Sequence, residues 1–435
     1  MSDLPLAGVG EFERLLRELT PVALGALVRR YGDFETCEDA VQEALIAAAA
    51  QWPADGLPDN PAAWLITVAS RRRIALWRGD DARRRRERTA ALLSSEGAEP
   101  AGLAGSAGLA DPGGLEPAGD DTLTLMLLCC HPALTVASRV ALTLRAVGGL
   151  STAEIAHGFL VPEATVGQRI SRAKQKLRGA RFELPSRAEL PERVVAVQRV
   201  LYLVFNEGYT ASSGAELQRP ELTAEAIRLT RQLRAQLPAQ LPADGETAGL
   251  LALMLLTEAR RAARTTADGA LVPLDAQDRA LWDEGLIEEG TALITRTLAS
   301  APVGPYQLQA AIAALHDEAA RAEDTDWAQI LAIYDHLAVL APGPVVALNR
   351  IVAVAMVHGP RAALEQLDAG LDAGLAAGPA AEPALGGHHR VPAVRAHLLE
   401  LTGDPGAARE QYLLAARMTL SGPERSYLER RARRA

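Results

Sequence analysis

The stretch LSTAEIAHGFLVPEATVGQRISRAKQKLR, Leu150 to Arg178, decides the fold of the region around it. Ser151 and Glu154 have the spacing of a capping box, which predicts the start of one short helix. Gly158 permits a turn, and Pro162 suits the first position of a second helix. Two short helices joined in this way are expected to form a helix-turn-helix.

The second of these helices separates its residues into two faces. A stripe facing a core is expected to contain Val166, Ile170, Ala173 and Leu177. The opposite face is polar and basic, and it contains Thr165, Gln168, Arg169, Arg172 and Lys176. In a major groove, the first three would read base edges and the last two would meet phosphates. A solvated charged helix is the alternative, but it leaves the capped helix, the turn and the one-sided basic face as a coincidence.

A second basic stretch, PAAWLITVASRRRIALWRGDDARRRRER, covers Pro61 to Arg88. From Arg71 to Arg88 it has nine arginines against three acids. The candidate DNA-binding residues here are Trp64, Arg71, Arg72, Arg73, Trp77 and Arg78. Aromatic faces and arginines suit the opening of a duplex, because stacking on an unpaired base is worth about 1 to 3 kcal/mol. Core packing is the alternative for each tryptophan, and Trp64 in particular has apolar neighbours.

These basic stretches belong to a chain whose net charge is -9, so the placement of charge is more informative than its sum. The 435 residues exceed what one core normally serves, which predicts two or more domains. The Ala- and Leu-rich composition, with 4% aromatic residues, predicts an all-α fold. Between the basic stretches, residues 89–120 are rich in Gly, Ala and Pro and carry acids without bases, which is typical of a flexible linker.

The N-terminal residues do not resemble a secretory signal, and the longest apolar run, Leu250 to Leu256, is too short to cross a membrane. A cytoplasmic protein without a membrane partner is therefore expected. The adjacent Cys129, Cys130 and His131 invite a zinc hypothesis. We reject it because no second ligand pair stands at a usual spacing, and we expect core residues at a helix end. No metal or other cofactor is predicted.

The motifs and breakers divide the chain into five parts: residues 10–88, the linker 89–120, residues 121–182 with the helix-turn-helix, a helical domain at 190–300, and helical repeats at 301–435. About eleven helices are expected after the boundary near residue 185. The repeats resemble tetratricopeptide-type helix pairs, with an irregular helical domain as the alternative. Asp404 and Pro405 are expected as N-cap and first residue of one such helix.

The segments TCEDAVQEALIAAAAQW and NPAAWLITVASRRRIALWR, together with the helix-turn-helix, resemble the two domains of extracytoplasmic-function (ECF) RNA polymerase sigma factors over residues 10–181. The resemblance implies that the surface around EDAVQEA binds core RNA polymerase, so Asp39, Gln42 and Glu43 are the candidates for that contact. It also implies recognition and melting of the promoter minus-ten element by residues 61–78. The helix-turn-helix would recognise the minus-thirty-five element.

One departure affects the melting helix. Members of the family usually carry an Asn shortly after the Trp-Leu pair and an Asp before the final Leu-Arg step, where this chain has Arg71 and Ala75. Promoter preference is therefore open. The resemblance also implies that the linker threads the basic interior of the polymerase, which an acidic segment suits; an ordinary solvated linker is the alternative.

The C-terminal half resembles the ECF subgroup with a long tetratricopeptide-like extension, which generally lacks a membrane-bound anti-sigma partner. The extension would then regulate activity in cis or through a soluble protein partner. Its apolar helices contain Asn206, Glu207, Arg260, Arg261, Gln307, Gln309 and His316. We expect an internal polar network, with a ligand or partner groove as the alternative.

The sequence thus predicts a sigma factor that binds core RNA polymerase and promoter DNA, with a C-terminal helical extension that regulates it. No catalytic constellation is found, so an enzyme is not predicted. A helix-turn-helix regulator with a helical sensor domain is the alternative function. It has no need of the EDAVQEA segment or of the Trp/Arg helix.

Overall fold

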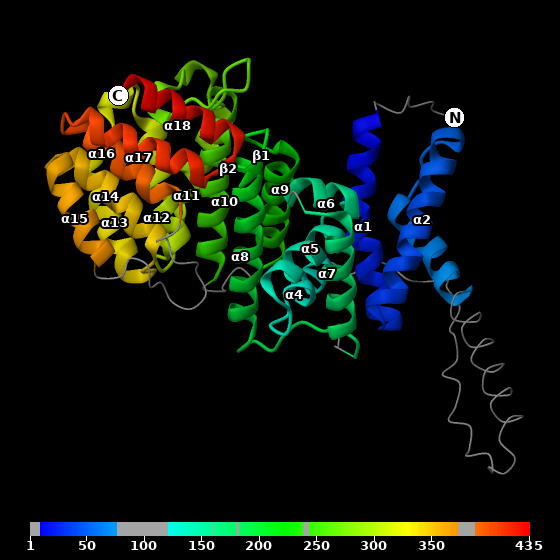
Figure 1. The fold of residues 1–435 in the computed structure, drawn as a ribbon. Coiled ribbons are helices and arrows are strands. Elements are labelled where there is room, and N and C mark those ends of the chain that lie inside the picture. Colours follow the sequence, from blue (N-terminus) through cyan, green and yellow to red (C-terminus); the bar gives the residue numbers. More distant parts are fainter. Residues whose placement is uncertain (1–8, 76–120, 160, 180–181, 238–242, 373–387) are drawn as a thin grey trace, which may run out of the picture. The chain divides into compact units, whose positions relative to one another are not determined.

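The computed structural model describes residues 9–75, 121–159, 161–179, 182–237, 243–372 and 388–435. Helices dominate these ranges, and their one sheet consists of two strands of two residues each. Figure 1 shows this helical organisation. The all-α prediction is therefore confirmed. The predicted linker 89–120 lies outside the described residues, as do Trp77 and Arg78.

The chain forms two compact units. The first contains residues 1–157 and 161–200, and the second contains residues 158–160 and 201–435. The division falls inside one helix, α8 (Leu190–Tyr209), between Val200 and Leu201.

The first unit begins with α1 (Val9–Tyr31), α2 (Phe34–Asp55) and a helix over residues 61–75. Gly32 and Asp33 make the tight turn between α1 and α2, with φ of 66° and 30°. Glycine adopts this left-handed region at no steric cost. The Thr36 hydroxyl donates to an Asp33 carboxylate oxygen at 2.9 Å, which supports the less favourable residue of the turn.

A short loop follows α2, in a proline-containing segment of the sequence that begins at Trp52. Helix α2 continues through Trp52 and Pro53 to Asp55, and its C-cap is Gly56, whose φ is 85°. Trp52 is 2% exposed, and this burial extends the helix past the first proline. The loop therefore occupies only residues 56–60.

The rest of the first unit is a set of short helices: α4 (Asp121–Cys129), α5 (Val136–Ala146), α6 (Thr152–Phe159), α7 (Glu163–Lys176) and the first half of α8. Every residue of α4 is buried, so α4 is surrounded by neighbours rather than packed on one side. At the start of α5, the Thr135 hydroxyl accepts from the Ser138 amide at 3.3 Å. This is an ordinary N-cap, and it fixes where α5 begins.

The second unit continues with α9 (Pro220–Gln236), α10 (Ala243–Ala259), α11 (Glu284–Ser300), α12 (Pro305–Glu318), α13 (Trp327–Leu340), α14 (Pro344–His358), α15 (Pro360–Asp372), α16 (Arg390–Leu401), α17 (Pro405–Met418) and α18 (Gly422–Arg434). With α8, the described residues hold eleven α-helices after the boundary, as expected. Short 3-10 turns at 261–263, 274–276, 279–281 and 322–324 connect some of them.

Helix α10 lies at the centre of the contacts with α11 and α12. The apolar run Leu250 to Leu256 belongs to it, and six of its seven residues are buried. A Cβ at Gly290 would lie 2.6 Å from Leu256 Cγ, and one at Gly249 would lie 2.7 Å from the Gln307 amide nitrogen. Glycine at both positions is what lets α11 and α12 approach α10 so closely.

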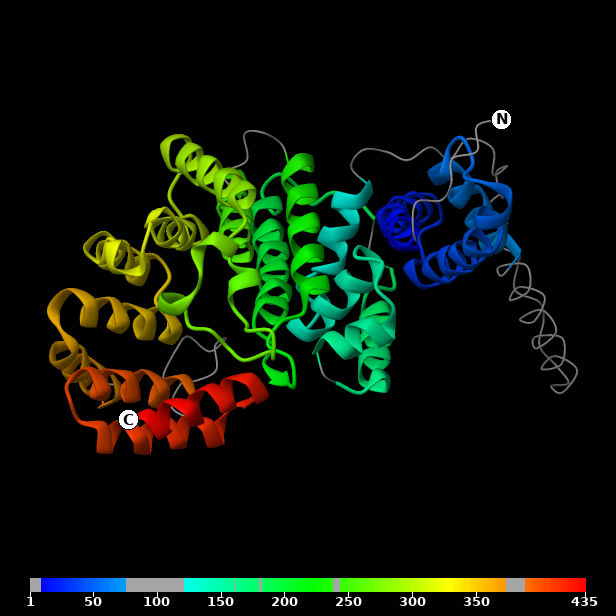
Figure 2. The same cartoon turned by 90° about the horizontal axis from the view of Figure 1, so that it is seen from above.

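The later helices follow one another along an arc, coloured from yellow to red in Figure 2. Each of these helices packs against the next. One hydrophobic core contains residues of the helices from α12 to α16, and another contains residues of α16, α17 and α18. Asp404 caps α17 by accepting from the Ala407 amide at 3.0 Å, and Pro405 is the first helical residue, as the sequence predicted. Such stacking is what tetratricopeptide-like repeats require.

A parallel strand pair joins the two ends of this second unit. Strand β1 (Ser213–Gly214) follows α8, and β2 (Leu420–Ser421) precedes α18. Ser213 pairs with Leu420 and Gly214 with Ser421. This pairing could not be predicted from the sequence, because two residues are too few for a strand pattern and their partners are about 200 positions apart.

Candidate nucleic-acid interface

The predicted helix-turn-helix consists of α6 and α7. The Ser151 hydroxyl accepts from the Glu154 amide at 3.1 Å, and the Glu154 carboxylate accepts from the Ser151 amide at 2.7 Å. This reciprocal capping box is the one predicted. Its hydrogen bonds to Ser151 help to hold the pKa of Glu154 below its usual value, against the opposing effect of burial. Gly158 lies in the last turn of α6, so the turn itself comes after Phe159 rather than at Gly158. Pro162 is the N-cap of α7, one position earlier than predicted.

The two faces of α7 differ in exposure as the sequence predicted. Val166, Ile170, Ala173 and Leu177 are all buried, at 1% to 6% exposure. On the other face Gln168, Arg172 and Lys176 are exposed, whereas Thr165 and Arg169 are half-buried. The Lys176 ammonium donates to the Ala133 carbonyl at 3.2 Å. Successive turns of α7 therefore present polar and basic side chains on the face opposite the core.

The helix over residues 61–75 divides its candidate residues between surface and interior. Arg71 and Arg72 are exposed. Trp64 is half-buried and packs edge-on against Trp52, with ring centroids 5.2 Å apart. Arg73 is 9% exposed, and its guanidinium lies 5.2 Å from the centre of the Tyr31 ring. This geometry favours packing roles for Trp64 and Arg73 over the DNA contacts predicted for them.

Helix α2 carries the residues predicted to contact the polymerase. Asp39 and Glu43 are exposed, and Gln42 is half-buried. Burial of its carboxyl is the main cause that raises the pKa of Asp39, with Lys174 acting in the opposite direction. Ile46 shares this face and is 70% exposed. Sequence reasoning missed Ile46, although an isoleucine seven positions after Asp39, on an otherwise polar face, was a signal that could have found it.

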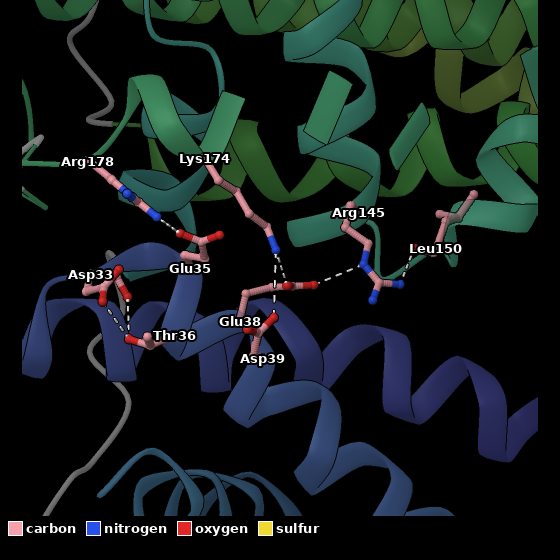
Figure 3. Close-up of polar contacts among 9 residues, drawn as sticks. All are labelled: Asp33, Glu35, Thr36, Glu38, Asp39, Arg145, Leu150, Lys174 and Arg178. Carbon is pink, nitrogen blue, oxygen red and sulfur yellow. Dashed lines mark hydrogen bonds and ion pairs between the residues drawn. The ribbon is translucent and has the colours of Figure 1, made fainter. Parts of the chain in front are cut away.

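The same helix carries a second set of acids that contact the helix-turn-helix. Glu38 is buried, and its carboxylate accepts from Arg145 Nε of α5 at 3.0 Å and from Lys174 Nζ of α7 at 2.5 Å (Figure 3). Glu35 accepts from Arg178 at 2.7 Å. We name these five residues the Glu38 cluster. Nothing in the sequence linked them, since their partners are more than 100 positions apart.

Comparison with known protein families matches two segments of this unit. The model for sigma-70 region 2 matches residues 15–84, and the model for sigma-70 region 4 matches residues 124–177. The chain belongs to the sigma-70 family. A family of unknown function (DUF6596) matches residues 193–298, so this sigma factor joins both regions to a C-terminal extension, as in an ECF-type sigma factor.

One relative shares nearly the whole length of this sigma factor. A protein of Rhizobium meliloti (strain 1021), described as uncharacterized, is 40% identical over 425 residues, which cover 97% of this chain and 95% of that protein. The similarity includes both sigma regions and the extension. No solved structure matches the chain. Among the residues described, no helix of the sigma factor is long and apolar enough to cross a membrane.

The cysteines of the sigma factor are core residues. Cys129 ends α4, and Cys130 follows it; both are fully buried. The Cys130 sulfur lies 3.6 Å from the Thr143 hydroxyl of α5, and burial raises the pKa of Cys130 to about 11. The Nδ1 of His131 accepts from the Ala133 amide at 3.1 Å. The expected position at a helix end is confirmed for both cysteines.

The polar residues inside the extension of the sigma factor are largely paired with one another. Arg260 is 7% exposed and donates to Asp317 at 2.6 Å and to the Ala313 carbonyl at 2.8 Å. Burial, helped by the positive charges of Arg260 and Arg279, lowers the pKa of His316 to about 4. The imidazole is therefore neutral at pH 7.

Three more of these polar residues have hydrogen-bond or ion-pair partners. Gln307 donates to the Thr297 hydroxyl at 3.3 Å, Gln309 accepts from the Tyr202 hydroxyl at 3.3 Å, and Glu207 pairs with Arg219 at 3.3 Å. Arg261 is exposed, so its predicted place inside the network is wrong. The internal network is otherwise favoured over a ligand groove.

Proposed function

We propose that this sigma factor brings core RNA polymerase to promoters through three surfaces and that its extension regulates the process. Helix α7 would read the minus-thirty-five element through Thr165, Gln168 and Arg169, with Arg172 and Lys176 on phosphates. The observation that carries this proposal is the division of α7 into a buried apolar stripe and an exposed basic face. An α-helix with such a face fits the major groove.

The other two surfaces lie on region 2. Exposed Arg71 and Arg72 would meet the minus-ten element, together with Trp77 and Arg78, which lie beyond the described residues. Asp39, Gln42 and Glu43 would contact the polymerase, and the exposed Ile46 beside them adds an apolar anchor to that face. Trp64 and Arg73 would support the melting helix from inside region 2.

Runoff transcription tests this assignment. The full-length protein is combined with purified core polymerase and a template that carries a promoter selected from genomic fragments. Promoter-specific transcripts are expected only when the sigma factor is present. Binding to the fragment without initiation would instead indicate a helix-turn-helix regulator, which is the alternative function.

For the extension we propose regulation in cis or through a soluble protein partner. The division of the chain into two units inside α8 supports this, because the extension is a separate compact unit that continues from a helix of the first one. Truncation after Val200 keeps the whole first unit. Transcript yield from the truncated protein should differ several-fold from that of the full-length protein, and equal yields at equal holoenzyme concentration would make the extension a passive appendage.

A further inference from the structure

The C-terminal end of α6 is bound by an arginine of the extension. Residues 158–160 belong to the second unit together with the extension, so this contact lies within one unit. The Arg219 guanidinium donates to the Gly158 carbonyl at 2.6 Å, and the arginine is 3% exposed. The two residues are 61 positions apart, and no local motif links them.

The carbonyl that Arg219 binds needs a partner from outside its helix. Gly158 is the next-to-last residue of α6, and the last four carbonyls of an α-helix have no intrahelical amide to accept from. A cation at this end also faces the negative end of the helix dipole. Arg219 therefore supplies both the donor and the charge that suit the end of α6.

Contacts within the extension fix Arg219 in place. Its backbone amide donates to the Gly208 carbonyl at 2.6 Å, and it is the N-cap residue of α9, directly before Pro220. Its guanidinium pairs with Glu207 at 3.3 Å and donates to the carbonyl of Ser213, in strand β1, at 3.2 Å. A side chain that is already held loses less conformational freedom when it binds the end of α6.

An apolar contact at the same residue accompanies the hydrogen bond. A Cβ at Gly158 would lie 3.1 Å from Cδ1 of Leu222, which is fully buried in the first turn of α9. Glycine at this position is what lets α9 come so close. Leu222 lies three positions after Arg219, so the start of α9 directs a polar and an apolar side chain to one residue of α6.

The place of this contact in the chain connects it with base reading. Helix α7 begins soon after Gly158, with Pro162 as its N-cap. The residues proposed to read bases lie in the first two turns of α7. In a helix-turn-helix, the first helix and the turn set the angle at which the second helix enters the major groove. A residue that fixes the end of α6 therefore acts on base reading without touching the DNA.

We propose that Arg219 is a positioning residue through which the extension supports recognition of the minus-thirty-five element by α7. This proposal rests on the proposed function, since it names a contact by which the extension regulates the sigma factor in cis. It also gives that regulation a direction. Truncation after Val200 removes Arg219, so it should lower transcription from promoters that depend on the upstream element.

Runoff transcription from two templates tests the proposal on the full-length protein. One template carries the intact promoter, and in the other the minus-thirty-five element is replaced by unrelated sequence. At equal holoenzyme concentration the wild type should give roughly tenfold more transcript from the intact template, because that template alone offers the base contacts of α7. Arg219→Met removes the donors but keeps an unbranched side chain. It should make the two yields nearly equal, with the yield from the second template unchanged. Arg219→Lys keeps the charge and should restore part of the difference.

Arg231→Met is the matched control. It removes another arginine of α9, whose side chain is 47% exposed and pairs with Glu289, and it should keep the wild-type difference between the templates. Arg219→Met leaves the carboxylate of Glu207 without this cation. The double variant with Glu207→Gln removes both charges, and it is used if circular dichroism shows that the single variant has lost helix.

The outcomes separate this proposal from the proposed function. A wild-type ratio of the two yields in Arg219→Met overturns the positioning role, even if both yields fall together, because the arginine then serves folding alone. An equal loss of the ratio in Arg231→Met overturns it as well. If the wild type gives no promoter-specific transcript, the sigma function itself fails. Equal yields from both templates for the wild type would remove the minus-thirty-five assignment.

Discussion

In region 4, Arg178 directly follows the C-cap of α7 and pairs with Glu35 of region 2, and the two side chains are 63% and 34% exposed. In the extension, Arg260 and Asp317 form their pair at 8% and 0% exposure. Both halves of the molecule are helical and use the same residue types. They differ in whether water can replace the partner.

The difference teaches how the two halves are expected to respond to change. Opening a half-exposed ion pair changes the free energy little, because water solvates both ions once they separate. A buried pair cannot be opened on one side without leaving a charge in a poor solvent. We therefore expect substitution of a buried charge, such as Arg260 in the extension or Glu38 in region 2, to cost more stability than substitution of an exposed one.

The largest effect is expected for Arg260→Gln. It removes the cation beside Asp317, whose pKa burial already raises, and takes away the hydrogen bond to Ala313. The free energy of unfolding of the extension should fall by about 3 to 5 kcal/mol. Chemical denaturation followed by circular dichroism measures it. The neighbouring Arg261→Gln, at an arginine side chain that is 47% exposed, should change the value by less than about 0.5 kcal/mol.

The next effect concerns pH and His316. Its pKa is lowered to about 4 from 6.5, so the unfolded chain binds the proton first as the pH falls. Stability from this histidine is complete above pH 6.5 and should decline by on the order of 2 to 3 kcal/mol as the pH falls to about 4. The decline is taken as the difference between wild type and His316→Gln in denaturation at each pH. An identical pH dependence in both proteins would contradict it.

Arg169→Ala should weaken promoter binding by about 1 to 3 kcal/mol, because the residue is placed to contact a base edge. A filter-binding or footprinting titration of the holoenzyme measures the change, and the effect should differ among sequence variants of the upstream element. Arg187→Ala changes an exposed arginine outside the helix-turn-helix and should leave binding as it is. Equal footprints for wild type and Arg169→Ala would show that another face of α7 reads the DNA.

The smallest effect is expected for Glu35→Gln. Its carboxylate pairs with Arg178 at 2.7 Å, but both side chains meet solvent, at 34% and 63% exposure. The free energy of unfolding, measured by chemical denaturation, should fall by less than about 1 kcal/mol, which is far less than in Glu38→Gln, where the carboxylate is buried. An equal loss of stability in both variants would show that the exposed edge of the Glu38 cluster contributes as much as its buried centre.

Local patterns made the sigma part of the molecule predictable. The spacing of Ser151 and Glu154 fixed the start of α6, and the 3.6-residue period of Val166, Ile170 and Ala173 fixed the buried side of α7. Such patterns reflect interactions between residues that are near in the chain, so they can be recognised without knowledge of the fold. The helix count of the extension and the start of α17 followed from the same kind of signal.

Other features depended on residues far apart in the sequence. Trp64 and Arg73 were predicted to contact DNA because the sequence pattern of tryptophans and arginines is the same whether their side chains are buried in a core or exposed to solvent. Only Trp52 and Tyr31, brought beside them, favour the packing role. The strand pair β1–β2 belongs to the same group.

By itself, the sequence determined that this chain is helical, where its helix-turn-helix begins, and which side of α7 turns to the core, because helix periodicity and capping are local. The tertiary structure alone decided which charges are partners. Glu38 meets Arg145 and Lys174, and Arg260 meets Asp317, through contacts between segments that the chain brings together only on folding. Burial of those contacts then sets their strength, and burial is a property of the whole fold rather than of any stretch of sequence.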